Sequence, residues 1–291
     1  MPETACVMDR TSLNDEAKRV LNSLLIEIEE ELQADLLTLI GPIRDGAELK
    51  VRIAIEKLPT RRGRLAVMLH SGGGVVEVAE RMVNIVRHLY KEVVFVVPDI
   101  AMSAGTVFAM SGDAIMMDYA SCLGPIDPQV EREGKLVPAL SYLAQYDRLI
   151  DKAQKGTLTE AEFLLLSKFD LAELHQYEMA RDLSVSLLVR WLTTYKFKDW
   201  NLTETKRQQV TSEAKQARAK EIATLLMDNT RWGSHGRGIP MDVLRDELKL
   251  RIDDFGVNAK LSSLIHRYFS LVIDFVVQNQ VGHLAHSREY L

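Results

Sequence analysis

The chain has 291 residues, of which 47% are hydrophobic and 26% are charged, and its formal net charge is -5 at pH 7. This length can bury one large core with an appendage, and the mild acidity gives no sign of general nucleic-acid binding. Two cysteines, Cys6 and Cys122, argue against a disulfide framework. Without a signal-peptide core or a long apolar run, the chain is predicted to be cytoplasmic, or attached to a membrane only through a partner.

The first part of the chain alternates helical and extended patterns. Strands are predicted at 34–40, 65–69, 93–97 and 114–117, and helices at 14–32, 46–58, 75–90 and 103–110. This alternation predicts parallel strands joined by crossover helices, with the site at the carboxyl ends of the strands. Beyond residue 137, helices are predicted at 138–155, 160–192, 204–227, 241–248 and 260–278, and a polar, solvated stretch at 196–216. The fold class is therefore α/β with an extended helical C-terminal part.

Two strand ends carry residues suited to acyl chemistry. Three glycines, Gly72 to Gly74, follow the strand that ends at Leu69-His70, and Ser103 lies between small residues after the next predicted strand. Glycines let backbone amides approach a substrate closely, and a serine at a strand end can be presented as a nucleophile. The alternative is that the glycines only form a tight turn and that Ser103 only caps a helix.

Three motifs in order resemble the serine dehydrogenase proteinase family, whose relatives in the Clp/crotonase fold include the Clp peptidase and signal peptide peptidase A. The motifs are His70-Ser71-Gly72-Gly73-Gly74-Val75, Met102-Ser103-Ala104-Gly105 and Leu123-Gly124-Pro125-Ile126-Asp127-Pro128-Gln129. The resemblance spans about 35–130 and resumes at 232–253, where 235–250 looks like the closing helix and strand of the fold. It implies a core of repeated ββα units wound into a superhelix.

The resemblance also implies roles for individual residues. Ser103 matches the nucleophile, and the amides of Gly74 and Ala104 match the two oxyanion donors. A helix that begins beside Ser103 would place its positive end near the developing oxyanion. An extended peptide would add as a strand beside Gly74, which makes Gly73 and Val75 the expected substrate-binding residues.

The proton acceptor departs from the family pattern. A Clp-type peptidase has a histidine about 25 positions after the serine, but this chain has Asp127 at that position. Where such a peptidase has its acid, just before the closing helix, this chain has His235. One hypothesis is a Ser103, His235 and Asp127 triad in which base and orienting acid have exchanged strand ends. The alternative is that Asp127 caps a turn between prolines and that His235 is a surface loop residue.

A serine–lysine dyad, as in signal peptide peptidase A, is the competing mechanism. A lysine that is buried beside apolar groups loses its charge and can accept the serine proton. The candidate bases are Lys135, Lys152 and Lys155, although none lies convincingly where the dyad lysine is expected, near 141–144. Lys152 and Lys155 are better explained as solvated helix positions than as bases.

The remaining histidines and glycines suggest no cofactor. His70 could line the substrate groove or be structural, while His283 and His286 lack the companion ligands that a metal site needs. No phosphate-binding GxxxxGK[ST] loop occurs, so any ATP-driven unfolding would come from a partner ATPase. We therefore predict neither a metal nor another cofactor.

The prediction for function is a serine endopeptidase that acts through an acyl-enzyme on Ser103. The alternatives are an inactive Clp/crotonase scaffold that serves as an oligomeric interaction module, or a crotonase-like acyl-group enzyme. The expected organisation is an N-terminal helix at 1–33, a peptidase domain at 34–255 with a helical insertion at about 138–230, and a helical tail at 256–291. Expected partners are a peptide or protein substrate, further copies of the chain, and a membrane protein or ATPase.

Overall fold

A computed structural model describes residues 13–132, 135–203 and 207–291, with Cys6 outside this part. The first half contains α1 (Leu13–Leu32), β1 (Asp35–Ile40), α2 (Ala47–Glu56), β2 (Arg64–His70), α3 (Val76–Leu89), β3 (Glu92–Val96), β4 (Ile100–Ala101), α4 (Ala104–Ala109), β5 (Ala114–Met117), β6 (Cys122–Leu123), β7 (Gln129–Arg132) and β8 (Lys135–Pro138). The second half contains α5 (Ala139–Gln154), α6 (Glu160–Leu166), α7 (Leu171–Trp191), a π-helix (Leu192–Lys196), α8 (Ser212–Met227), α9 (Asn229–Trp232), β9 (Ile239–Pro240), α10 (Met241–Asp246), β10 (Asp253–Asp254), a 3-10 turn (Phe255–Val257), α11 (Ala259–Gln278) and β11 (Leu284–His286).

The main sheet has six strands in the order β10-β5-β3-β2-β1-β11. Its pairs are parallel, as the alternation of strand and helix predicts, except that β11 runs antiparallel to β1. Segment 256–291 therefore supplies a long helix and an edge strand. The observed α/β class confirms the prediction from the sequence.

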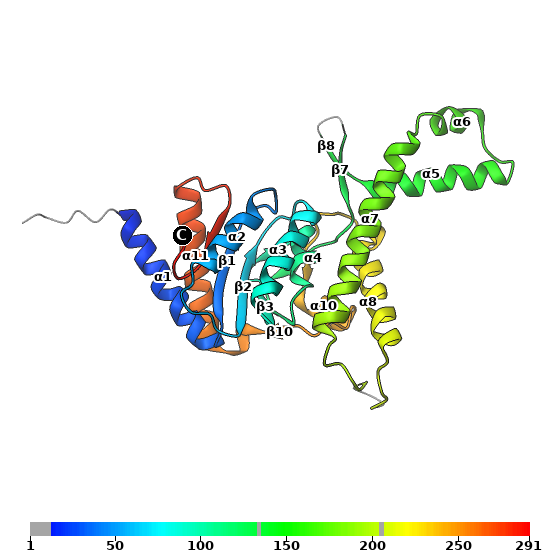
Figure 1. The fold of residues 1–291 in the computed structure, drawn as a ribbon. Helices are drawn as coiled ribbons and strands as arrows, with labels where there is room; N and C mark the ends of the chain where they lie inside the picture. The colour runs from blue at the N-terminus through cyan, green and yellow to red at the C-terminus, as the bar shows by residue number, and fades with distance from the viewer. Residues whose placement is uncertain (1–12, 133–134, 204–206) are drawn as a thin grey trace, which may run out of the picture.

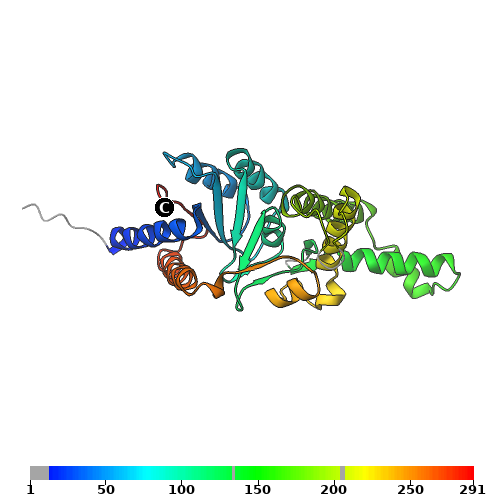
Figure 2. The same cartoon turned by 90° about the horizontal axis from the view of Figure 1, so that it is seen from below.

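Alternate residues of the strands enter two cores on opposite faces of the sheet. Leu37, Val67 and Phe95 pack with α2, α3 and α4, while the residues after them point the other way, toward α1 and α11. The two covering layers flank the sheet in Figures 1 and 2. Because both faces are buried, the strands read as unbroken apolar runs.

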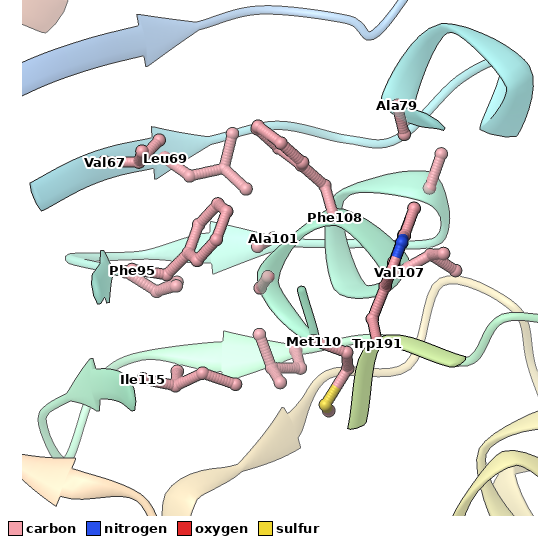
Figure 3. Close-up of a cluster of buried hydrophobic side chains, with 14 of the residues drawn as sticks. Val67, Leu69, Ala79, Phe95, Ala101, Val107, Phe108, Met110, Ile115 and Trp191 are labelled. Atoms are coloured by element: carbon pink, nitrogen blue, oxygen red, sulfur yellow. The ribbon is translucent and has the colours of Figure 1, made fainter. Parts of the chain in front are cut away.

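Helices α7 and α8 join the first of these cores. Trp191 of α7 is 2% exposed and belongs to the same cluster as Phe95 and Phe108, whose rings meet edge to face with centroids 4.8 Å apart. Figure 3 shows Trp191 beside Val107 of α4. α7 and α8 are thus part of the main body, and α4, which begins directly after Ser103, is held between them and the sheet.

Between β6 and α7 the chain forms an arm that leaves the body. It comprises the β7–β8 hairpin, α5, α6 and the first turns of α7, and it projects well beyond the other elements in Figures 1 and 2. Its own core consists of four buried residues, Ala139, Leu143, Leu174 and Tyr177. Helix α6 buries none of its residues.

Two predicted helices have different bounds in the structure. The predicted helix at 160–192 is wrong as one element, because Asp170 caps a new helix by accepting hydrogen bonds from the amides of Ala172 and Glu173. The helix predicted from residue 204 begins at Ser212, since the side chain of Thr211 accepts from Ala214 N and sets the start there. No helix in the described residues is long and apolar enough to span a bilayer.

Candidate active site

A small sheet beside the main one gathers the predicted site residues. Its order is β4-β6-β9, and Ser71 bridges to Ala101 at its edge, donating to Ile100 O at 3.0 Å and accepting from Met102 N at 2.9 Å. β4 and β6 are parallel and β9 is antiparallel, so the ends of the first two lie at the same edge as the start of the third. Ser103, Asp127 and His235 all lie within four residues of that edge.

Ser103 connects β4 to α4 through a strained backbone. Its φ of +52° and ψ of -120° are rare for a residue other than glycine, and it is the last residue before the first turn of α4. Such strain is found where a side chain must be presented in one orientation. Ser103 makes no side-chain cap hydrogen bond to α4, although its carbonyl accepts from Val107 N at 3.1 Å.

The glycine turn lies directly against this serine. A Cβ built on Gly73 would be 2.7 Å from Ser103 Cβ, and one on Gly74 would be 2.0 Å from the carbonyl oxygen of Ile43. Their φ values are +102° and +144°. Both positions therefore require glycine, for space and for backbone conformation.

Gly74 turns its own amide away from Ile43. Ile43 donates to Gly73 O and accepts from Val75 N, both at 2.8 Å, in a parallel bridge. In such a bridge the residue opposite Ile43 turns its N–H and carbonyl the other way. Among the described residues, the amides of Gly74 and of Ala104 donate to no recorded acceptor.

His235 and Asp127 are brought together, although 108 positions separate them. His235 Nδ1 lies 2.8 Å from Asp127 Oδ1, and Asp127 is fully buried while the imidazole is 23% exposed. An ionised carboxylate can only accept, so a neutral imidazole in this contact carries its proton on Nδ1 and leaves Nε2 as the acceptor. Within the described residues, no hydrogen bond joins His235 to Ser103, so the proton path closes only when that gap is bridged.

The loops that carry this pair share anchors. Thr106 of α4 donates to Ala101 O at 2.7 Å and accepts from Gly124 N at 2.9 Å, which fixes the Asp127 loop to the serine helix. The end of α8 holds both loops: Ile126 N donates to Leu226 O at 3.0 Å, and the Trp232 indole donates to Leu225 O at 2.8 Å. The sequence predicted the helix that ends at Met227, but its contacts with these loops and the role of Thr106 were missed, because such contacts leave no local pattern.

The alternative bases lie elsewhere. Lys152 pairs with Glu162, and Lys155 Nζ is 2.7 Å from Asp151 Oδ2, both within the arm. Lys135 opens β8, and its side chain is outside the described part. Lys152 is in the last turn of α5 and Lys155 is its C-cap, and α5 extends away from the body in Figure 1.

The other histidines have structural surroundings. His70 packs on Phe269 of α11 with ring centroids 5.3 Å apart, and burial lowers its pKa although Asp99 is nearby. His286 is buried, and its Nδ1 lies 2.8 Å from the Tyr268 hydroxyl. In residues 13–132, 135–203 and 207–291 no group of three or more His, Cys, Asp or Glu side chains could hold a metal ion.

A second imidazole–carboxylate pair lies on the far side of the sheet. His266 Nε2 of α11 is 2.7 Å from Asp118 Oδ2, and Ser262 Oγ is 3.4 Å from His266 Nδ1. The Asp118 carboxylate also accepts from Ala120 N and Ser121 N at 2.9 and 3.1 Å. These contacts fix the 118–121 turn against α11.

Comparison with known proteins agrees with the motifs. Residues 43–164 match the model of the ClpP-like SDH-type serine proteinases. Two uncharacterized proteins of Methanocaldococcus jannaschii are similar: MJ1495 is 27% identical over 48% of this chain and 45% of its own length, and MJ0137 is 34% identical over 33% and 32%. The chain thus spans under half the length of these curated relatives.

A mutant of the 1510-N membrane-bound stomatin-specific protease is a distant structural neighbour. It has a TM-score of 0.41 and 11% sequence identity, over 77% of this chain and 81% of that chain. The family match contains Gly74, Ser103, Ala104 and Asp127, whereas His235 lies beyond it. The family resemblance predicted from the three motifs is confirmed over residues 43–164, where the chain matches the model of the ClpP-like SDH-type serine proteinases.

Proposed function

We propose that this protein is a serine peptidase in which Ser103, His235 and Asp127 form an exchanged triad. The observation that carries the proposal is the 2.8 Å contact between His235 Nδ1 and the buried Asp127, at the sheet edge from which Ser103 also emerges. A triad is defined by geometry and roles, so base and acid can come from either strand end.

The reaction follows from the atoms at this edge. Ser103 Oγ attacks the peptide carbonyl carbon while its proton passes to His235 Nε2, and the amides of Gly74 and Ala104 bind the oxyanion. The C–N bond then breaks, and the same proton moves to the leaving amine. Water, deprotonated by His235, attacks the carbonyl carbon of the resulting ester. The bond from that carbon to Ser103 Oγ then breaks, Oγ takes the proton back from His235, and the acid is released. Asp127 keeps the Nδ1 proton in place and stabilises the imidazolium.

The substrate of this site is an extended peptide. The N–H and carbonyl of Gly74 face away from Ile43, and a peptide strand that added there would pair with the Gly73–Val75 segment. Its scissile carbonyl would then lie beside Ser103, since Gly73 is in close contact with that residue.

A fluorophosphonate probe tests the nucleophile. We expect the wild-type protein to be labelled on Ser103, and Ser103→Ala to take up no label while its unfolding transition is unchanged. Ser262→Ala is the matched control, because Ser262 lies near an imidazole that belongs to the other pair. Equal labelling of wild type and Ser103→Ala, with no cleavage of a broad peptide library, would overturn the peptidase proposal.

We also propose that a second copy of this chain docks on the arm. Phe163, Leu164 and Leu165 of α6 are 59%, 59% and 55% exposed, and the small core of the arm leaves them uncovered. An apolar cluster at the end of a projecting element is typical of a protein interface, and most soluble assemblies are built from copies of one chain.

Sedimentation velocity tests this interface. We expect the wild type to sediment as an oligomer and Leu164→Glu to sediment as a smaller species, because the introduced charge would be buried without a partner. Leu49→Glu is the control, since Leu49 of α2 is 56% exposed on the body and should leave the assembly intact. A monomeric wild type, or an oligomeric Leu164→Glu variant, contradicts the proposal.

A further inference from the structure

Asp127 has two oxygen atoms in a fully buried position, and each has its own partner. Oδ1 accepts from His235 Nδ1 at 2.8 Å, and Oδ2 accepts from Gln129 Nε2 at 3.0 Å. Within the described residues these are the polar contacts recorded for this carboxylate. A carboxylate whose two oxygens are held in different directions cannot rotate about its side-chain bond without breaking one contact.

Gln129 is also the residue at which the arm begins. It is the first residue of β7 and pairs with Pro138 at the end of β8, and Ala139 N of α5 donates to Pro128 O at 2.9 Å. The hairpin and α5 therefore leave the body at the two residues that follow Asp127. Because Gln129 belongs both to the base of the arm and to the contacts of Asp127, a change in the angle of the arm would act on its carboxamide.

We propose that Gln129 is a positioning residue, which holds Asp127 in the orientation that His235 needs and makes that orientation depend on the seating of the arm. The inference rests on the proposed function, because the pair matters for activity only if His235 serves Ser103. While Gln129 Nε2 donates to Asp127 Oδ2, the other oxygen, Oδ1, faces the imidazole. When this hydrogen bond is lost, the buried Oδ2 has no donor, and the carboxylate turns so that both oxygens share the imidazole N–H.

A double-mutant cycle tests this role through the rate constant for fluorophosphonate labelling of Ser103. We expect Gln129→Leu, which keeps the volume and removes the donor, to lower this rate about 10- to 100-fold, as for a lost hydrogen bond to a charged group. In an Asp127→Ala background the same change should cost no more than about twofold, because a residue that acts through Asp127 has nothing left to position.

Gln145→Leu is the matched control, since Gln145 is exposed on α5 in the same arm. Gln129→Met serves in place of the leucine variant if that one does not fold. Labelling at the wild-type rate in Gln129→Leu would overturn the inference, as would an equal loss of rate in both backgrounds, which would indicate a structural role independent of Asp127.

The proton resonance of His235 Nδ1–H separates this inference from the function on which it rests. In the full-length protein we expect a sharp downfield signal, assigned by its loss in His235→Ala, that broadens or disappears in Gln129→Leu and persists in Gln145→Leu. If Ser103 is never labelled, the peptidase proposal fails, and the role of Gln129 is then tested by this resonance alone. An unchanged signal in Gln129→Leu would then overturn the role of Gln129.

Discussion

Asp127→Asn is expected to lower the rate of Ser103 labelling by up to about 10,000-fold, the loss seen when a triad acid becomes an amide. The asparagine carries no charge to stabilise the imidazolium that forms as Ser103 attacks. If its amide nitrogen faces His235 Nδ1, the imidazole must accept there, and its proton moves to Nε2, the atom that should take the serine proton. Binding of a peptide to the Gly73–Val75 edge should be little affected, so the loss belongs to kcat.

Asp118→Asn is the matched control for this change. Asp118 is also buried, at 1% exposure, and its carboxylate also faces an imidazole at 2.7 Å, that of His266. The same substitution there should lower the free energy of unfolding, because Ala120 N and Ser121 N share that carboxylate, while labelling of the folded fraction stays at the wild-type rate. A labelling rate in Asp127→Asn equal to that in Asp118→Asn would exclude the triad.

The parts of the site that could be predicted are those with a local pattern. Gly74 and Ser103 follow strands with unbroken apolar runs, and the family motifs around them are short and contiguous. The position of Asp127, 24 residues after Ser103, and of His235 before the closing elements gave a testable pairing hypothesis. The structure places those two side chains in contact, whereas the step from His235 to Ser103 stays a proposal.

The parts that could not be predicted depend on contacts between distant segments. β9 consists of two residues, Ile239–Pro240, too few for any period, yet its pairing with β6 brings the His235 loop to the edge. The anchoring of both loops on the end of α8 likewise has no local signal. The break at Asp170 did have one, since Asp170 followed by Glu173 is typical of a helix start.

Gly74→Ala should also lower the labelling rate strongly, although by less than the loss of the acid and for a different physical reason. The new Cβ would lie 2.0 Å from Ile43 O, at a φ of +144° that L-residues rarely adopt, so the turn must move away from Ile43. The strain costs about 1–3 kcal/mol in the free energy of unfolding. A displaced Gly74 amide removes one oxyanion donor, which is worth about 100- to 1,000-fold in the labelling rate.

Gly72→Ala is the control that separates the effect of displacing the Gly74 amide from the general effect of placing a methyl group in this turn. A Cβ on Gly72 meets no atom within 4 Å. The free energy of unfolding of this variant should therefore lie within about 0.5 kcal/mol of the wild-type value, and Ser103 should be labelled at a similar rate. Urea unfolding and labelling, measured on the same samples, distinguish the two expectations. If folded Gly74→Ala labels as fast as Gly72→Ala, the amide of residue 74 does not bind the oxyanion, and the second donor besides Ala104 lies elsewhere in the turn.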